Sequence, residues 1–343
     1  MQAGPGRTAV LLFNLGGPDK PADVRGFLYN LFADKRIINL PWGARQAVAA
    51  LIASRRAPLA RKNYALIGGG SPLLRETQAQ ADALQAVLDA QGDEARVFVG
   101  MRYWRPFIED TAREISAYRP DRIVVLPLYP QFSSTTTLSG FEAFRKAYKG
   151  PGETHYVCCY ADNPRFIRAH ADAIAAVIGG LKAPETYRLL FSAHGLPEAI
   201  VERGDPYQEQ VEASVRRIMD ALAVDMDYAI CYQSRVGPLN WIGPSTDEMI
   251  REAGRDGKPV ILVPVAFVSE HIETLVELDI EYAHLAQAAG VPDYVRVPAL
   301  GVDPGYIAAL RDEVVKAIGA GAAVSGDHDC AACHTFCPKR RAA

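Results

Sequence analysis

The sequence predicts an α/β protein built from two doubly wound lobes. Short runs of β-branched and apolar residues alternate with longer amphipathic segments, which is the pattern of parallel strands joined by helices. The chain has 343 residues, of which 49% are hydrophobic, so it can bury a large core and exceeds the length of one typical domain. Eight predicted strands fall into two groups of four, which indicates an internal duplication.

Each lobe is predicted to hold a four-stranded parallel sheet flanked by helices. In chain order, the predicted strands are Ala9–Leu15, Arg96–Met101, Ile123–Leu128 and His155–Tyr160, then Arg188–Ser192, Tyr228–Gln233, Val260–Val265 and Val295–Ala299. The segments with helical periodicity are 21–34, 44–54, 74–92, 106–117, 163–180, 207–223, 245–256, 270–288 and 304–318. We therefore expect a first lobe over 1–160, a second over 161–320, and a tail over 321–343.

Charge and hydropathy exclude several classes of protein. The net charge is -3 and the pI is near 6.2, so no basic face for nucleic acid is expected. No run approaches the roughly 20 apolar residues that a membrane-spanning helix needs, and the amino-terminal segment is typical of a strand and turn rather than a signal peptide. We expect a cytoplasmic protein whose six cysteines are reduced or bound to metal.

Ligands of doubly wound sheets bind beyond the carboxyl ends of the strands, so candidate residues were sought there. Gly16-Gly17 follows the first strand, and Gly68-Gly69-Gly70 forms a second glycine cluster. Neither completes a dinucleotide fingerprint or a phosphate loop. Ordinary turns explain both clusters as well as a ligand does.

Histidines and carboxylates follow two strands of the second lobe. His194 ends the fifth strand, and the seventh runs into a segment that holds His271 and Glu273. Two imidazoles and a carboxylate near one cleft can bind a transition metal or relay protons. Glu273, Glu277 and Glu281 recur at i, i+4 and i+8, which indicates either a solvated acidic face or a path for cations or protons.

The chain resembles the ferrochelatase family, whose members insert ferrous iron into protoporphyrin IX. The matching motifs cover nearly the whole chain in one order: Leu12-Phe13-Asn14-Leu15-Gly16-Gly17-Pro18, Ile67-Gly68-Gly69-Gly70-Ser71-Pro72, Gly100-Met101-Arg102-Tyr103, Phe191-Ser192-Ala193-His194, Arg203-Gly204-Asp205-Pro206-Tyr207, Gln233-Ser234-Arg235-Val236-Gly237-Pro238, and His271-Ile272-Glu273-Thr274-Leu275 with Glu277-Leu278-Asp279.

The resemblance implies two Rossmann-like lobes of the chelatase kind, closing on a porphyrin cleft. It implies catalytic roles for His194, Glu273 and His271, with His194 and Glu273 facing each other across a bent macrocycle. His194 is a fitting proton acceptor, and Glu273 and Glu277 would hold or pass the metal, although the two sides can be exchanged with His194 as the metal ligand. Ferrous iron and protoporphyrin IX would be the substrates and protohaem the product.

The same resemblance implies a set of substrate contacts: Leu15, Ser71, Arg102, Tyr103, Gln233, Ser234 and Trp241, with Arg55 and Arg56 meeting the propionates. Core packing explains Tyr103 and Trp241 equally well. The basic and apolar segment 27–57 would form the lips of the pocket and rest on the inner face of a membrane, or simply pack between domains. A homodimer is compatible with the resemblance.

The tail carries a separate signal, since Cys330, Cys333, His334 and Cys337 lie within eight residues. A c-type haem site fits the spacing but requires export. Zinc with His334 as the fourth ligand is stereochemically sound, and a [2Fe-2S] cluster needs a fourth cysteine. The resemblance favours the cluster, with Cys158 preferred over Cys159 to complete Cys330, Cys333 and Cys337. Cys231 is expected to be a buried apolar thiol.

Two other functions remain open at this stage. A cobalt or nickel chelatase of related fold would use the same side chains, because imidazole and carboxylate discriminate weakly among first-row divalent ions. A tetrapyrrole or iron carrier would bind its ligand without turnover.

Overall fold

The computed structural model describes residues 6–235 and 239–342, and it divides the chain into two compact units. The first unit comprises 1–129, 133–158 and 310–325, and the second comprises 130–132, 159–309 and 326–343. Helix α11 (Pro304–Gly319) therefore begins in the second unit and continues into the first. The predicted lobes are contiguous along the chain, whereas each observed unit collects several segments. Val236-Gly237-Pro238 of the resemblance motif lies outside the described residues.

The first unit is built on a parallel sheet of order β2-β1-β3-β4-β9. Its strands are β1 (Thr8–Asn14), β2 (Ala95–Met101), β3 (Arg122–Pro127), β4 (Glu153–Val157) and β9 (Val324–Ser325). The short β9 is an addition to the four predicted strands. Its pairing with β4 is why part of the segment predicted as tail belongs to the first unit.

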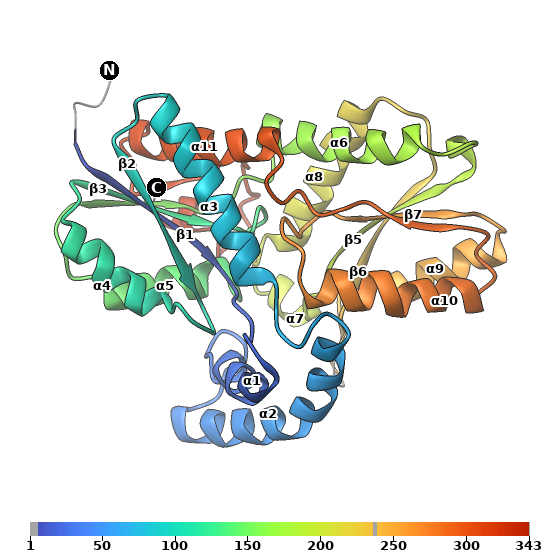
Figure 1. Cartoon of the computed structure of the whole chain (residues 1–343), viewed down its shortest axis with the longest axis horizontal. Coiled ribbons are helices and arrows are strands. Elements are labelled where there is room, and N and C mark those ends of the chain that lie inside the picture. Colours follow the sequence, from blue (N-terminus) through green and yellow to red (C-terminus); the bar gives the residue numbers. More distant parts are fainter. Residues whose placement is uncertain (1–5, 236–238, 343) are drawn as a thin grey trace. The chain divides into compact units, whose positions relative to one another are not determined.

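Helices cover both faces of this sheet. Figure 1 shows α3 (Leu73–Ala90) and the end of α11 on one face, with α4 (Ile108–Tyr118) and α5 (Thr137–Ala147) on the other. The short η1 (Pro21–Asp23), α1 (Val24–Phe32) and α2 (Trp42–Ala65) form a separate helical layer of the unit, in which α1 packs against α2. Helix α5 was missed in the sequence because its buried face is made partly of Thr, Ser and Gly.

The second unit is built on a parallel sheet of order β6-β5-β7-β8. The strands are β5 (Arg188–His194), β6 (Tyr228–Gln233), β7 (Val260–Pro264) and β8 (Tyr294–Arg296). This order repeats β2-β1-β3-β4 of the first unit, as the predicted duplication requires. The helices and turns of the unit are α6 (Pro164–Gly179), η2 (Pro184–Thr186), α7 (Glu198–Val201), α8 (Tyr207–Leu222), α9 (Thr246–Arg255), η3 (Glu273–Glu281), α10 (Tyr282–Ala288) and α12 (Pro338–Ala342).

The predicted helix over 270–288 is the largest departure from expectation in the second unit. Its first half, η3, is a π-helix, and only α10 is α-helical. π-helical turns are rare and are found mostly at functional sites. This one begins at Glu273, one of the predicted catalytic residues.

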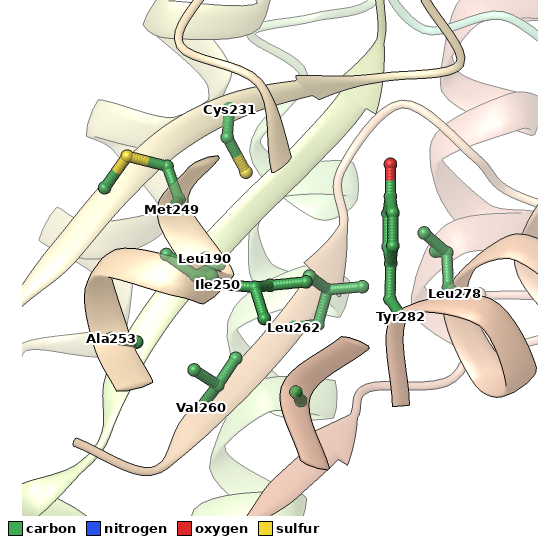
Figure 2. Close-up of a cluster of buried hydrophobic side chains, with 10 residues drawn as sticks. Leu190, Cys231, Met249, Ile250, Ala253, Val260, Leu262, Leu278 and Tyr282 are labelled. Atoms are coloured by element: carbon green, nitrogen blue, oxygen red, sulfur yellow. The ribbon is translucent and has the colours of Figure 1, made fainter. Parts of the chain in front are cut away.

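A buried apolar cluster packs against η3 and α10. Leu262 of β7 lies at its centre, with Ile250 of α9 on one side and Leu278 of η3 and Tyr282 of α10 on the other (Figure 2). Cys231 of β6 belongs to the same cluster and is fully buried, as predicted for an apolar thiol. The core thereby fixes one face of the helix that presents the acidic residues.

We expect Leu262→Ala to lower the free energy of unfolding by about 2–5 kcal/mol, because it removes a fully buried side chain and leaves a cavity. Urea denaturation followed by circular dichroism measures this change. Val302→Ala serves as the control, since Val302 is 51% exposed and should cost under about 0.5 kcal/mol. Equal effects of the two substitutions would contradict the role assigned to the cluster.

Candidate functional site

The candidate site lies at the carboxyl edge of the second sheet. His194 is the last residue of β5 and pairs in register with Gln233, the last residue of β6. The neighbouring strand β7 ends at Pro264, and the chain then reaches His271 and the start of η3. Parallel strands bring their carboxyl ends to one edge of a sheet, so the topology gathers these residues from segments far apart in the sequence.

Glu273 lies between two imidazoles. Its Oε1 is 3.8 Å from His194 Nε2, and its Oε2 is 3.5 Å from His271 Nε2. Groups that flank a flat ring need about 7–8 Å between them, since each contact takes roughly 3.5–4 Å. No ring fits between His194 and Glu273 at this distance. In this structure the two side chains therefore lie together, whereas the resemblance implied that a macrocycle separates them.

The hydrogen bond of His194 fixes which of its nitrogens can accept a proton. His194 Nδ1 lies 2.6 Å from the carbonyl oxygen of Gly195. A carbonyl can only accept, so Nδ1 carries the hydrogen and Nε2 of the neutral ring has the free lone pair. The buried Tyr207 lies alongside, bonded to the backbone of His194 and within electrostatic range of Glu273.

The two carboxyl groups at the start of η3 differ in their affinity for protons. Burial opposes ionisation of Glu273, but His194 and His271 outweigh it and lower its pKa to about 2. Burial raises the pKa of Glu277, and the charge of Glu273 raises it further, while hydrogen bonds from Ser234 act in the opposite direction. Neighbouring carboxyls whose pKa values are driven apart can divide acid and base roles.

Glu277 is surrounded by hydrogen-bond donors. The backbone N–H of Ser234 donates to its Oε1 at 2.9 Å, and the Ser234 hydroxyl and Gln233 Nε2 (3.2 Å) donate to Oε2. Tyr282 completes the set with a 3.1 Å bond to Oε1. Ser234 adopts a left-handed φ of 62° to place both of its donors. Strain of this kind at a non-glycine residue is typical of functional sites.

Gln233 and Ser234 were predicted as substrate contacts, and the structure gives each a contact with Glu277. Gln233 is 1% exposed and also accepts from the Ser192 hydroxyl at 2.8 Å. The three glutamates spaced at i, i+4 and i+8 differ in exposure. Glu273 and Glu277 are half-buried, while Glu281 is exposed. A functional role is therefore considered only for Glu273 and Glu277.

Trp241 was predicted to frame the pocket. It is half-buried beside Gly195, where an added Cβ would lie 3.2 Å from the indole ring. Its Nε1 is buried, and within the described chain it has no hydrogen-bond partner. A buried donor of this kind is unusual.

The first unit carries a second group of polar residues at its own strand ends. Asp34 is 8% exposed and accepts hydrogen bonds from Arg102 Nη2 (2.8 Å) and the Tyr103 hydroxyl (2.8 Å), and also from Ser139. Arg102 lies over the Tyr103 ring, and its Nε donates to Ser139 at 2.7 Å. Burial and the charge of Asp34 raise the pKa of Tyr103, which is 1% exposed. Asp34 was not predicted, because nothing in its local sequence distinguishes it from other surface acids.

Arg102 and Asp34 also line an open hollow of about 350 Å³, together with Asn30 and Asp110. Leu15 is half-buried next to this group, where its carbonyl accepts from the Tyr103 N–H at 2.9 Å. Arg55 is exposed on α2, with its neighbour Arg56 over the ring of Phe32.

The two glycine clusters pack against each other. A Cβ at Gly17 would lie 2.4 Å from Ser71, and one at Gly70 would lie 2.3 Å from the carbonyl oxygen of Asp19. The Ser71 N–H donates to the Pro18 carbonyl at 2.8 Å. Close approach of two backbone loops therefore explains these glycines, and Ser71 sits at their contact.

The tail cysteines are only partly gathered. Cys159, Cys330 and Cys337 are buried free thiols in the second unit, whereas Cys333 is exposed. The Cys330 side chain forms a hydrogen bond with Cys337 and accepts another from Gln210 Nε2 at 3.3 Å. Cys158 belongs to the first unit. Among the described residues, no group of three or more His, Cys, Asp or Glu side chains is arranged to hold a metal ion. The arrangement does not by itself support the predicted [2Fe-2S] cluster.

Two tail histidines are bound to acids of the second unit. His328 bridges Asp162 (2.9 Å) and Glu209 (3.0 Å), and His334 Nε2 also contacts Glu209. The bond to Asp162 raises the pKa of His328 to about 9, against the effect of burial and with help from Glu209. His334, the alternative fourth ligand for zinc, is thus engaged by a carboxylate.

Comparison with known families gives one match over most of the chain. The family model described as ferrochelatase matches residues 7–318. A ferrochelatase from Phenylobacterium zucineum is 52% identical over 337 residues, covering 97% of this chain and 98% of the relative. A ferrochelatase from Caulobacter vibrioides is 51% identical over 343 residues, covering 98% and 99%.

Solved structures agree on the fold. SirB from Bacillus subtilis with Fe3+ superposes with a TM-score of 0.52 at 14% identity, covering 91% of this chain and 96% of that one. The sirohydrochlorin chelatase SirB from Bacillus subtilis subspecies spizizenii, in complex with cobalt, gives a TM-score of 0.50 at 11% identity, covering 91% and 95%. At these identities the likeness concerns the fold alone.

The low pKa of Glu273 predicts an acid-dependent loss of stability. Its pKa falls from 4.5 to about 2 on folding. Its contribution to the free energy of unfolding is therefore full above about pH 4.5 and disappears as the pH falls toward 2. His271→Gln removes one cause of the pKa shift, so the free energy of unfolding should decrease less between pH 5.5 and pH 3.5, as measured by urea unfolding at the two pH values.

The control for this experiment is His284→Gln, because His284 is exposed on α10. It should lose as much stability between the two pH values as the unmodified protein. A decline in His271→Gln as steep as in the control would contradict the ion pair with Glu273.

Proposed function

Because this chain belongs to the ferrochelatase family, we propose that its His194, Glu273 and His271 carry out the reaction of that family, the insertion of ferrous iron into protoporphyrin IX to form protohaem. The observation that carries this assignment is the 3.8 Å distance between His194 Nε2 and Glu273 Oε1 at the carboxyl edge of the second sheet. Ferrous iron is a substrate here, and its insertion requires the loss of two pyrrole protons.

Removal of those protons is assigned to His194. Its Nε2 has a free lone pair, since Nδ1 donates to the Gly195 carbonyl. A proton accepted at Nε2 gives the ring a positive charge, which the ionised Glu273 attracts across 3.8 Å. An imidazole is a suitable base near neutral pH, and the carboxyl of Glu277 lies one turn further along η3 as the next proton acceptor.

Glu273, with His194 and Glu277, is assigned to brief contact with the metal ion. Brief contact suits a transfer reaction, in which the ion must leave the protein for the porphyrin. Tight binding of the ion before transfer would lower KM without raising kcat. The low pKa of Glu273 keeps it anionic at neutral pH, so it attracts a divalent cation.

Contact with the porphyrin is assigned to Leu15, Arg102, Trp241 and Arg55. Arg102 is held by Asp34 but remains 22% exposed, and Arg55 is exposed on α2. Both can pair with a propionate. Tyr103, Ser71, Gln233 and Ser234 are also assigned to the porphyrin pocket. Hydrogen bonds to Asp34 hold Tyr103 in place, and hydrogen bonds to Glu277 hold Gln233 and Ser234.

The helical layer of α1 and α2 is assigned to a membrane surface at the inner face. Its large exposed apolar side chains include Trp42 (74%), Leu51 (50%) and Leu59 (65%), and they lie among basic residues such as Arg55 and Arg56. Such a surface can rest on anionic lipid. Within the described ranges, no helix is long and apolar enough to cross a bilayer.

The function is tested by mixing the protein anaerobically with protoporphyrin IX and ferrous iron and following absorbance. Conversion to the haem spectrum with repeated turnover supports the proposal. Binding of porphyrin without turnover would indicate a carrier, and preference for cobalt, nickel or another tetrapyrrole would indicate a different chelatase.

We expect His194→Ala to retain porphyrin binding and lose about 10²–10⁴-fold in kcat, the usual worth of a general base. Glu273→Gln should lower kcat by a comparable factor, because the substitution removes the negative charge of the carboxylate. Glu281→Gln is the matched control, since Glu281 is exposed on the same π-helix, and it should stay within about twofold of the unmodified protein. Near-normal turnover in His194→Ala would remove His194 from the mechanism.

For the tail we propose a [2Fe-2S] cluster, supported by the spacing of Cys330, Cys333 and Cys337. The sequence favoured Cys158 as the fourth ligand, and we propose Cys159 instead, because it is buried and acts electrostatically on Cys330. Since Cys333 is exposed and the thiols are not arranged around a metal, the tail must rearrange to bind the cluster. No step of the reaction is assigned to it.

Anaerobically purified protein should be brown, because thiolate-bound ferric iron absorbs visible light. Cys333→Ser and Cys159→Ser should bleach it, while Cys231→Ser, a buried thiol in another part of the unit, should keep the colour. A colourless protein with one equivalent of zinc and no acid-labile sulfide would overturn the cluster and leave the chelatase assignment intact.

A further inference from the structure

Arg296, a residue of β8 that plays no part in the proposed chemistry, binds carboxylates on both sides of the catalytic segment. Its Nη2 lies 2.9 Å from Asp279 Oδ2, and its Nε binds the other oxygen of the same carboxylate. Its Nη1 lies 2.9 Å from Glu270 Oε1. The Arg296 side chain is 12% exposed. A bidentate contact between a guanidinium and a carboxylate fixes the orientation of the two side chains in addition to pairing their charges.

The two carboxylates bracket the residues that the mechanism uses. His271, Glu273 and Glu277 all lie between Glu270 and Asp279 in the sequence. Arg296 therefore closes a loop around this stretch by binding both of its ends.

Glu270 extends the restraint into the start of η3. Its Oε1 also accepts from the Ala299 N–H at 2.9 Å, and its Oε2 accepts from the Thr274 hydroxyl. Thr274 in turn accepts from the His271 N–H at 3.0 Å. The position of Arg296 is thus linked through two side chains to the backbone of His271.

Strand β8 contributes a second restraint on the same helix. The Tyr294 hydroxyl donates to the Leu278 carbonyl at 2.7 Å. Tyr294 and Arg296 are two residues apart, so their side chains leave the strand on the same face. A π-helix has weaker intrinsic support than an α-helix, and here its backbone and its acidic side chain are both held by one strand.

We propose that Arg296 is a positioning residue for metal insertion, which holds Glu270 and Asp279 so that the π-helix presents Glu273 and Glu277 to the site. This inference rests on the proposed function of those two glutamates. Arg296 itself does not touch substrate. Its loss affects the rate of the chemical step and leaves the binding of porphyrin unchanged.

The chain offers a matched control in Arg188. This arginine begins β5, the strand whose last residue is His194, so it lies at the opposite edge of the same sheet. Its side chain is 10% exposed and binds three carboxylates, those of Asp227, Glu252 and Asp256. Substituting it removes a comparably buried arginine from an ion cluster that does not include η3.

The experiment compares Arg296→Gln with Arg188→Gln in anaerobic insertion assays with protoporphyrin IX and ferrous iron, at a temperature where urea titration shows both to be folded. Arg296→Gln should lose about 10- to 100-fold in kcat, the range for a small misplacement of catalytic groups. Its KM for porphyrin should stay within about twofold. Arg188→Gln should show a similar fall in urea midpoint with kcat within about twofold.

Two further variants separate positioning from folding. Asp279→Asn leaves the Arg296–Glu270 contact in place and should reproduce the fall in kcat even if Arg296→Gln does not fold. Arg296→Lys keeps the positive charge but cannot form the bidentate contact, so its kcat should lie between those of Arg296→Gln and the unmodified protein.

Equal kcat in the Arg296, Asp279 and Arg188 variants, or a loss confined to KM, would overturn the positioning role. An unmodified protein that fails to insert iron would instead overturn the proposed function, so the two failures are distinguishable.

Discussion

The second unit is organised around one electrostatic problem, which is how to keep two carboxyl groups, Glu273 and Glu277, close together in a half-buried site. Like charges on adjacent helical turns repel, and burial strengthens the repulsion. The structure answers by giving each group different partners. Glu273 faces the imidazoles of His194 and His271, which favour its ionised form. Glu277 faces hydroxyl and amide donors and has a raised pKa. The two carboxyl groups therefore differ in their affinity for protons, as the proposed transfer of protons and metal requires.

That asymmetry depends on where the helix is held. Leu278 and Tyr282 are buried in the cluster around Leu262, which fixes one face of η3 and the start of α10 (Figure 2). Tyr282 contributes to both the packing and the polar contacts, because its ring belongs to the core and its hydroxyl donates to Glu277. The other supports come from the neighbouring strands, through Ser234 after β6 and Arg296 in β8. Packing and polar contacts thus restrain the same short segment from several sides, which is the condition for preorganised catalysis.

The sequence was sufficient to predict the fold class and the division of the strands into two groups, because both follow from a regular pattern. His194 and Glu273 were candidates because each follows a predicted strand, and the family resemblance added their expected catalytic roles. The partners of those residues were not predictable in the same way. Tyr282 reaches Glu277 only because η3 is π-helical, and no periodicity in 270–288 indicates this. Asp34 is recognisable only when 102–103 and 139 are placed around it. The tail was the weakest prediction, since cysteine spacing specifies a ligand set without specifying where each thiol lies.

The repeated strand order gives the two units equivalent edges with opposite chemistry. In the first unit Asn14 of β1 pairs with Met101 of β2, and Leu15, Arg102 and Tyr103 follow directly. In the second unit His194 of β5 pairs with Gln233 of β6 at the corresponding place. The first edge holds a cation, Arg102, by means of the buried carboxylate Asp34. The second holds carboxylates by means of imidazoles and hydroxyls. The same strand order therefore presents a guanidinium at the edge of one sheet and carboxylates at the edge of the other.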